Sequence, residues 1–123
     1  VAKFLETSDK IVSVTYPGLE TDQYHALAQK YLPNGTCGVI SFSIKGGRPA
    51  AVRFMDALEL ASIEVHVADI RTCVLHPASA THRQLTEEQL VAAGIDGGLI
   101  RLSVGLEHVD DILADVKQAL DRV

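Results

Sequence analysis

Hydrophobic residues recur along this chain with two different spacings, which predict strands and helices in turn. Alternating or β-branched runs predict strands, and apolar residues three or four positions apart predict helices. The candidate strands are residues 11–18, 37–44, 62–68, 72–77 and 98–105. The candidate helices are residues 22–33, 48–61, 86–94 and 107–123, and the first residues have the composition of the end of another helix.

The helix predicted at residues 22–33 has clear signals at both ends. Asp22 can cap its start, and Pro33 with Gly35 ends it. Its apolar positions at helical spacing are expected to face the core. They are Tyr24, Leu27, Ala28 and Tyr31.

Together these elements predict a two-layer α/β sandwich, in which about four strands form one sheet and helices cover one of its faces. Several connections between strands are short, so the sheet is expected to be mostly antiparallel. With 123 residues the chain is long enough to bury a core of its own. The prediction is therefore a single domain spanning residues 1–123.

Composition and charge narrow the classes of partner. The net charge is −5 and there is no lysine or arginine cluster, which argues against nucleic acid or an anionic membrane surface as the partner. The apolar runs are too short to span a bilayer and no signal-peptide pattern opens the sequence, so a cytoplasmic protein is expected. The two cysteines have no metal-binding spacing and are expected to be buried free thiols.

Three polar groups could carry chemistry, and each has a simpler explanation. His66, His76 and His82 are close in sequence but lack metal-ligand spacing, so no metal site is predicted. The stretch "KGGRP" lacks the spacing of a phosphate-binding loop, which favours a strand-to-helix turn. The stretch "HPASATH" offers Ser79 beside His82 but no nucleophile elbow, so serine catalysis is not predicted.

Arg101 is the most informative charged residue, because it lies in the otherwise apolar stretch "LIRLSVGLEH". Alternation along a strand places Ile100 and Leu102 on one face and Arg101 with Ser103 on the other. If helices cover the first face, Arg101 lies on the opposite one, where its planar fork can bind a carboxylate through two parallel hydrogen bonds. A solvated arginine and a structural ion pair remain open alternatives.

Three stretches together resemble one known family. They are "VSVTYPGLETDQYHALAQKYLPNGTCGVISFSIKGG", "ADIRTCVLHPASATHRQL" and "LIRLSVGLEHVDDILADVKQAL". From about residue 10 onwards the chain is similar to the C-terminal domain of the Cys/Met-metabolism enzymes that use pyridoxal 5'-phosphate, and within them to the O-acetylhomoserine sulfhydrylase branch. The resemblance implies the small C-terminal domain of a fold-type I enzyme. We therefore expect a fragment of a longer enzyme, whose N-terminal domain carries the cofactor and its lysine.

The same resemblance implies a role for Arg101 in binding the α-carboxylate of an amino-acid substrate. Lys45 of "IKGG" does not match the family's cofactor-binding lysine, so no catalytic residue and no bound cofactor are expected in this fragment, which should be inactive alone. The implied reaction replaces the acetate of O-acetylhomoserine with sulfide or methanethiol, giving homocysteine or methionine. The resemblance also implies contact with the enzyme's own N-terminal domain and a homotetrameric parent enzyme.

Two residues depart from the family pattern in "EVHVADIRT". His66 stands where the family has serine or asparagine, and Ala68 stands where it has glycine. Because this segment lies near the substrate carboxylate in the family, His66 is a second candidate substrate-binding residue; the alternative is that it only fills space. Cystathionine γ-synthase, methionine γ-lyase and a binding module without catalysis remain alternative functions.

Overall fold

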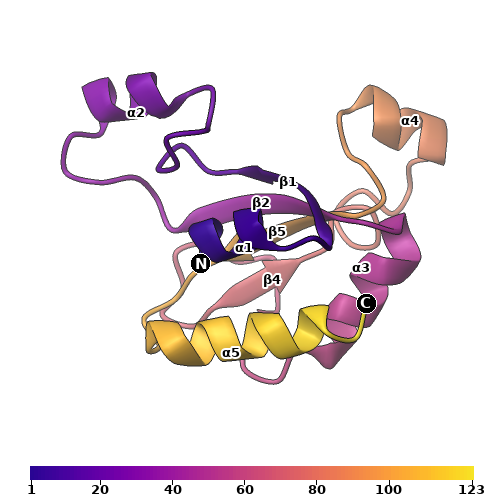
Figure 1. Cartoon of the computed structure of the whole chain (residues 1–123). Coiled ribbons are helices and arrows are strands. Elements are labelled where there is room, and N and C mark those ends of the chain that lie inside the picture. The colour runs from indigo at the N-terminus through magenta and orange to yellow at the C-terminus, as the bar shows by residue number, and fades with distance from the viewer.

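The computed structural model describes residues 1–123, and its centre is one five-stranded sheet (Figure 1). The strands are β1 (Ile11–Thr15), β2 (Val39–Ile44), β3 (Ser62–Ile63), β4 (Cys73–Leu75) and β5 (Leu99–Ser103), in the order β1-β2-β5-β4-β3. The helices are α1 (Ala2–Thr7), α2 (His25–Tyr31), α3 (Gly47–Ala57), α4 (Glu87–Ala92) and α5 (Val109–Leu120). None of these helices combines the length and the apolar composition needed to cross a membrane.

The hydrophobic core lies between one face of the sheet and the helices α1, α3 and α5. A single cluster of 17 buried residues joins these four parts. The rings of Phe42 on β2 and Phe54 on α3 meet edge to face at its centre, with centroids 5.8 Å apart. Ile100 and Leu102 of β5 are fully buried in the same cluster. The predicted two-layer sandwich with helices on one face is therefore confirmed.

The sheet differs from the prediction in two details. It has five strands rather than about four, and it is mixed, because β3 runs parallel to β4 while the other three pairings are antiparallel. The parallel pair consists of only two residue pairs, Ser62 with Cys73 and Ile63 with Val74. A pairing this short at the edge of the sheet leaves little trace in the sequence.

The strand predicted over residues 62–68 is mostly wrong. Only Ser62–Ile63 is strand, and the chain then leaves the sheet as an exposed loop. Alternating valines made the segment resemble a strand, yet Val65 and Val67 are 55% and 52% exposed. The loop reverses at Ala68, whose φ of +60° is incompatible with a strand.

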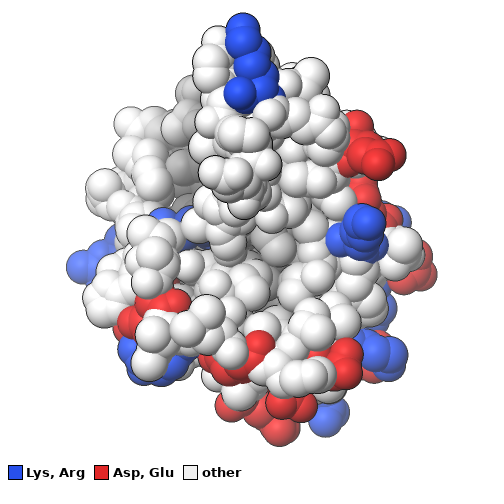
Figure 2. All heavy atoms as spheres, turned by 90° about the vertical axis from the view of Figure 1, so that its left-hand side faces the viewer, with Lys and Arg blue, Asp and Glu red and all other residues white.

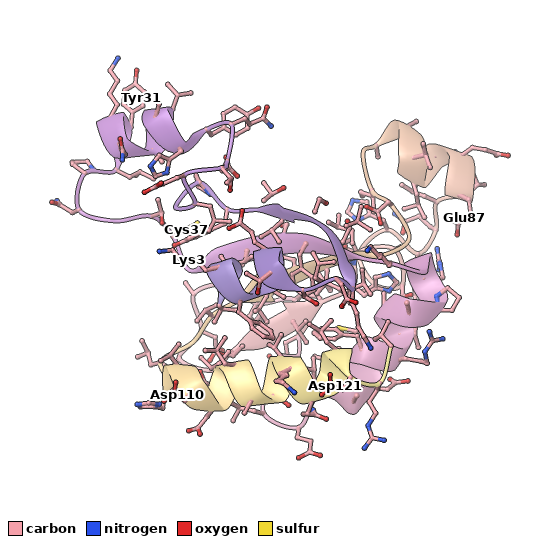
Figure 3. The ribbon with its side chains drawn as sticks, in the orientation of Figure 1. Lys3, Tyr31, Cys37, Glu87, Asp110 and Asp121 are labelled. Carbon is pink, nitrogen blue, oxygen red and sulfur yellow. The ribbon has the colours of Figure 1, made fainter.

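The expected buried face of the helix near residue 22 is also wrong. Helix α2 begins only at His25, and it stands on an arm away from the core at the upper left of Figure 1. Of its predicted core residues only Ala28 is buried, while Tyr31 is 67% exposed and points away from the rest of the protein (Figure 3). Asp22 does not cap the helix; its carboxylate accepts the backbone N–H groups of Tyr16 and Tyr24.

The remaining helix signals are confirmed. The glycines of "KGGRP" make the predicted turn into α3, and both adopt positive φ. Thr86 begins α4 with a capping box that includes Gln89. At the start of α4, Glu87 points towards α3, where it pairs with Arg48 at 2.9 Å (Figure 3).

The charged side chains are spread over the surface rather than gathered by sign. On the face turned to the viewer in Figure 2, blue and red residues lie around the rim and alternate along its lower edge, while the middle is uncharged. No broad basic surface is visible on this face, in agreement with the net charge of −5. A site for an anion in this domain therefore depends on individual residues.

Candidate functional site

Arg101 lies in the middle of the sheet, on the face opposite to α1, α3 and α5. Its neighbours on β5, Ile100 and Leu102, are completely buried in the core, so alternation directs the arginine side chain to the other side. In the register of the sheet Arg101 pairs with Ser41 of β2 and with Leu75 of β4. The strand prediction for this residue is therefore confirmed.

The guanidinium of Arg101 has only one hydrogen-bond partner. Its Nη2 donates to the backbone carbonyl of Val65 at 2.6 Å, and its Nε is buried with no acceptor. No carboxylate of the chain pairs with it, whereas Arg48 and Arg71 both form ion pairs. A partly buried guanidinium without a counter-charge attracts an anion more strongly than a solvated one.

The carbonyl that contacts Arg101 belongs to the loop between β3 and β4, whose charged residues pair with one another. Arg71 bonds the carboxylates of Glu64 at 3.0 Å and Asp69 at 3.4 Å, and His66 Nδ1 lies 2.9 Å from Glu64. The backbone N–H and guanidinium of Arg71 hold the pKa of Asp69 below its usual value. These contacts stay within the loop and fix its internal shape rather than its position on the sheet.

Two hydrogen bonds connect the middle of this loop to the sheet, and both come from β5. Besides the bond from Arg101 to Val65, the hydroxyl of Ser103 accepts the backbone N–H of Ala68 at 3.1 Å. Ala68 is the one residue other than glycine with a positive φ. The glycine that the resemblance places at this position would adopt this conformation without steric cost.

The end of the loop is fixed by Gly105, at the end of the predicted strand, and by two residues that the sequence patterns did not single out, Glu107 and Thr72. Glu107 accepts two hydrogen bonds from Thr72, and the Thr72 hydroxyl in turn accepts the N–H of Gly105. A Cβ at Gly105 would collide with the backbone at Arg71 and Thr72, so only glycine fits this close approach. The motif "RLSVGLE" therefore links the strand of Arg101 to the loop between β3 and β4. In the sequence, only the family resemblance pointed to this motif.

The three histidines that are close in sequence have separate partners. His66 is 62% exposed and pairs within the loop, His76 bonds the carbonyl of Gly97, and His82 bonds Thr81. The ligand atoms of Glu64, His66 and Asp69 do converge within 4.8 Å, but Arg71 already forms ion pairs with both carboxylates. His66 follows Val65 directly, so the loop places it one residue from the carbonyl that Arg101 contacts.

Two lysines, Lys45 and Lys10, lie away from Arg101. Lys45 is exposed in the turn after β2, four residues beyond Ser41, which pairs with Arg101. That separation corresponds to roughly 13 Å along the strand. Lys10 donates to the carbonyls of Leu120 and Val123 at the end of α5. Neither of these two lysines is therefore placed beside Arg101.

The sheet of this α/β domain thus presents an arginine without a counter-charge on its helix-free side, an arrangement that can hold an anionic group. Residues 1–121 match the family of Cys/Met metabolism PLP-dependent enzymes, and the chain belongs to this family.

Relatives from several organisms support this assignment. The chain is 47% identical to an O-acetyl-L-homoserine sulfhydrylase from Leptospira meyeri, with all of the chain and 28% of that protein aligned. It is 49% identical to a homocysteine synthase from Schizosaccharomyces pombe and 46% identical to an L-methionine gamma-lyase from Fusobacterium nucleatum, covering 98% and 100% of the chain and 28% and 31% of those proteins. The chain therefore spans less than a third of the length of these relatives.

Solved structures share the fold. A Campylobacter jejuni protein described as an O-acetylhomoserine (thiol)-lyase, which holds a pyridoxyl-lysine phosphate, superposes with a TM-score of 0.88 at 42% identity over 98% of this chain and 28% of that one. A cystathionine gamma synthase from Xanthomonas oryzae gives a TM-score of 0.87 at 36% identity over 98% of this chain and 31% of that one. The expected family and its use of pyridoxal phosphate are confirmed.

Proposed function

We propose that this chain is the substrate-carboxylate-binding domain of an O-acetylhomoserine sulfhydrylase that uses pyridoxal phosphate. The observation that carries the proposal is Arg101, a partly buried guanidinium with a buried Nε, one carbonyl contact and no carboxylate partner within the chain. The other outcomes for such a residue, full solvation or a structural ion pair, do not match these contacts.

A carboxylate suits Arg101 because the planar guanidinium offers five N–H donors and the Val65 carbonyl uses one of them. Two parallel hydrogen bonds to one carboxylate fix both its position and its orientation. The Val65 contact holds the guanidinium in one place before the substrate arrives. Arg101 therefore binds and orients an α-amino acid and takes no part in proton transfer.

The cofactor and the chain divide the chemistry between them. Pyridoxal phosphate, when bound to the parent enzyme, serves as the electron sink for reactions at the α, β and γ carbons of an amino acid. When Arg101 holds its carboxylate, the bound amino acid cannot rotate freely. Its fixed orientation decides which bond at Cα is aligned for reaction. We assign the cofactor and its lysine to an N-terminal domain of a longer enzyme, which lies beside this chain, and we expect the assembled enzyme to be a homotetramer.

The reaction is proposed from the relatives. Sulfhydrylase and homocysteine synthase are the names of the relatives at 47% and 49% identity, and both names fit the replacement of acetate by a sulfur nucleophile. A methionine γ-lyase at 46% identity makes elimination the second candidate. His66 next to Val65 is the residue of this chain that we expect to influence the choice between donors.

Two assays of the full-length holoenzyme test this proposal. Formation of homocysteine from O-acetyl-L-homoserine and sulfide is expected to exceed release of methanethiol from L-methionine by at least about 100-fold in kcat/KM. The opposite ranking assigns the chain to the lyase branch. No turnover of either substrate, in a protein that contains the cofactor, favours a binding module without catalysis.

The role of Arg101 is tested separately. Arg101→Lys keeps the charge and loses the fork, so we expect kcat/KM to fall by about 100-fold, and further in Arg101→Ala. Arg53→Ala, which removes an exposed arginine from α3, is the matched control and should leave the activity unchanged. Equal activity in the Arg101 and Arg53 variants would remove the carboxylate-binding role.

A further inference from the structure

The loop that contacts Arg101 is anchored to the sheet at few points. Glu64 at its start donates a backbone hydrogen bond to Val74, and Ile70 at its end accepts one from Leu106. Between these two residues, the backbone is hydrogen-bonded to the sheet only at Val65 and Ala68. The side chains of Val65 and Val67 are more than half exposed, so packing does not hold this segment down. Its position over Arg101 therefore depends on hydrogen bonds.

Of the two hydrogen bonds that hold this segment on the sheet, one comes from Arg101 and the other from Ser103. Ser103 follows Arg101 by two residues on β5, on the same face of the sheet, and is 2% exposed. Its hydroxyl accepts the N–H of Ala68 at the point where the chain turns with a φ of +60°. A residue with a Cβ stays in that conformation only where its surroundings hold it there.

We propose that Ser103 is a positioning residue for the substrate-carboxylate site, acting on Arg101 through the loop. By holding the Ala68 turn, the Ser103 hydroxyl keeps the Val65 carbonyl against Nη2 of Arg101, and this contact aims the guanidinium at the substrate. The inference rests on the proposed role of Arg101, since it concerns the orientation of the same group.

Loss of the Ser103 hydroxyl has a defined consequence. Ala68 relaxes to a negative φ, the Val65 carbonyl moves off Arg101, and the guanidinium samples other orientations in the absence of substrate. The guanidinium must then be ordered again on binding, and this cost weakens the binding of the substrate and of the transition state equally. The expected result is a higher KM with kcat nearly unchanged. The sulfur nucleophile carries no carboxylate, so its KM is expected to stay the same.

The test uses the full-length holoenzyme with O-acetyl-L-homoserine and sulfide, or L-methionine if that is the substrate turned over. Ser103→Ala is expected to raise KM for the amino acid by about 10-fold with kcat within about two-fold. Ser103→Thr retains the hydroxyl and is the conservative control, expected to keep KM near the wild-type value. Adding Ala68→Gly to Ser103→Ala removes the steric cost of the turn and should recover most of the lost KM.

A second variant disturbs the hydrogen bond between Ala68 and Ser103 by changing Ala68, on the exposed loop. Ala68→Val leaves the buried sheet untouched and disfavours the left-handed turn, so it too should raise KM for the amino acid. If Ser103→Ala fails to fold, this variant decides the question.

An unchanged KM in Ala68→Val, or in a folded Ser103→Ala, contradicts the positioning role, and so does a fall in kcat with KM unchanged. If Arg101→Ala also leaves KM unchanged, the proposed function fails as well; if it raises KM, only the inference about Ser103 fails.

Discussion

Glu107 accepts two hydrogen bonds from Thr72, one from the backbone N–H at 2.7 Å and one from the hydroxyl at 2.8 Å. Burial alone would raise the pKa of Glu107, but these donors outweigh it and lower the pKa below its usual value. A carboxyl with a lowered pKa stabilises the folded chain at neutral pH. That contribution is lost as the pH falls below roughly 4.3, the pKa of an unfolded glutamate, and through the lower pKa of the folded state.

Glu107→Gln is therefore expected to destabilise the chain by about 1–2 kcal/mol at pH 7, because an amide N–H₂ then faces one of the Thr72 donors. Urea unfolding at pH 7 and again near pH 3.5 measures the effect, which should shrink at the lower pH. Glu20→Gln, at an exposed position, is the control. A difference between wild type and variant that is independent of pH would contradict the role of the Glu107 charge.

Gly105→Ala tests the close approach between the end of β5 and the loop. The added Cβ meets the backbone at Arg71 and Thr72, so the two segments must separate. We expect a loss of about 2 kcal/mol in the free energy of unfolding and faster hydrogen exchange at the residue 105 amide, which in the wild type donates to the Thr72 hydroxyl. Unchanged exchange at this amide would show that the junction tolerates a side chain.

Ala68→Gly is expected to stabilise the chain by about 0.5–1 kcal/mol. Glycine removes the steric cost of a positive φ, and this gain exceeds the extra entropy that glycine gives the unfolded chain. Ala92→Gly, in the exposed last turn of α4, should have the opposite sign. Thermal unfolding of both variants checks the prediction, and a fall in Tm for Ala68→Gly would mean that Ala68 does not hold a left-handed turn in solution.

Asp115 is a buried carboxylate that joins α5 to the loop after α3. It accepts the backbone N–H groups of Glu59, Leu60 and Ala61 at 2.8–3.0 Å. Burial acts to raise the pKa of Asp115, yet these donors leave it lowered.

Asp115→Asn should cost about 3 kcal/mol in urea unfolding, because one acceptor oxygen becomes a donor facing buried N–H groups. Asp9→Asn, at an exposed position, is the control and should change little. Equal stability of the two variants would contradict a structural role for the Asp115 carboxylate.

The sequence predicts best those features that local patterns determine. Alternation around Arg101 predicts which side of β5 enters the core, because one buried face imposes a two-residue period. The capping residue Thr86 and the glycines before α3 mark helix ends in the same local way. The two-layer arrangement follows from elements that each have one apolar face.

Features that depend on contacts between distant residues could not be read from those patterns. The valines at 65 and 67 alternate as in a strand, but Ala68 turns the chain and both valines stay exposed. Tyr31 has the spacing of a core residue, but its helix stands on an arm away from the core. Likewise the bond between Ser103 and Ala68 spans 35 positions. The family resemblance pointed to Arg101 and to this loop, but not to the hydrogen bonds that join them.

The most direct measurement compares a substrate with and without its carboxylate, in full-length enzymes with and without Arg101. Wild-type enzyme is expected to prefer O-acetyl-L-homoserine over its α-carboxamide by about 100-fold in kcat/KM, because the neutral amide loses the charge-assisted pair. In Arg101→Ala this preference should fall to within a few-fold of unity. If Arg101→Ala retains the full preference for the carboxylate, another residue binds that group and Arg101 does not have the role proposed for it.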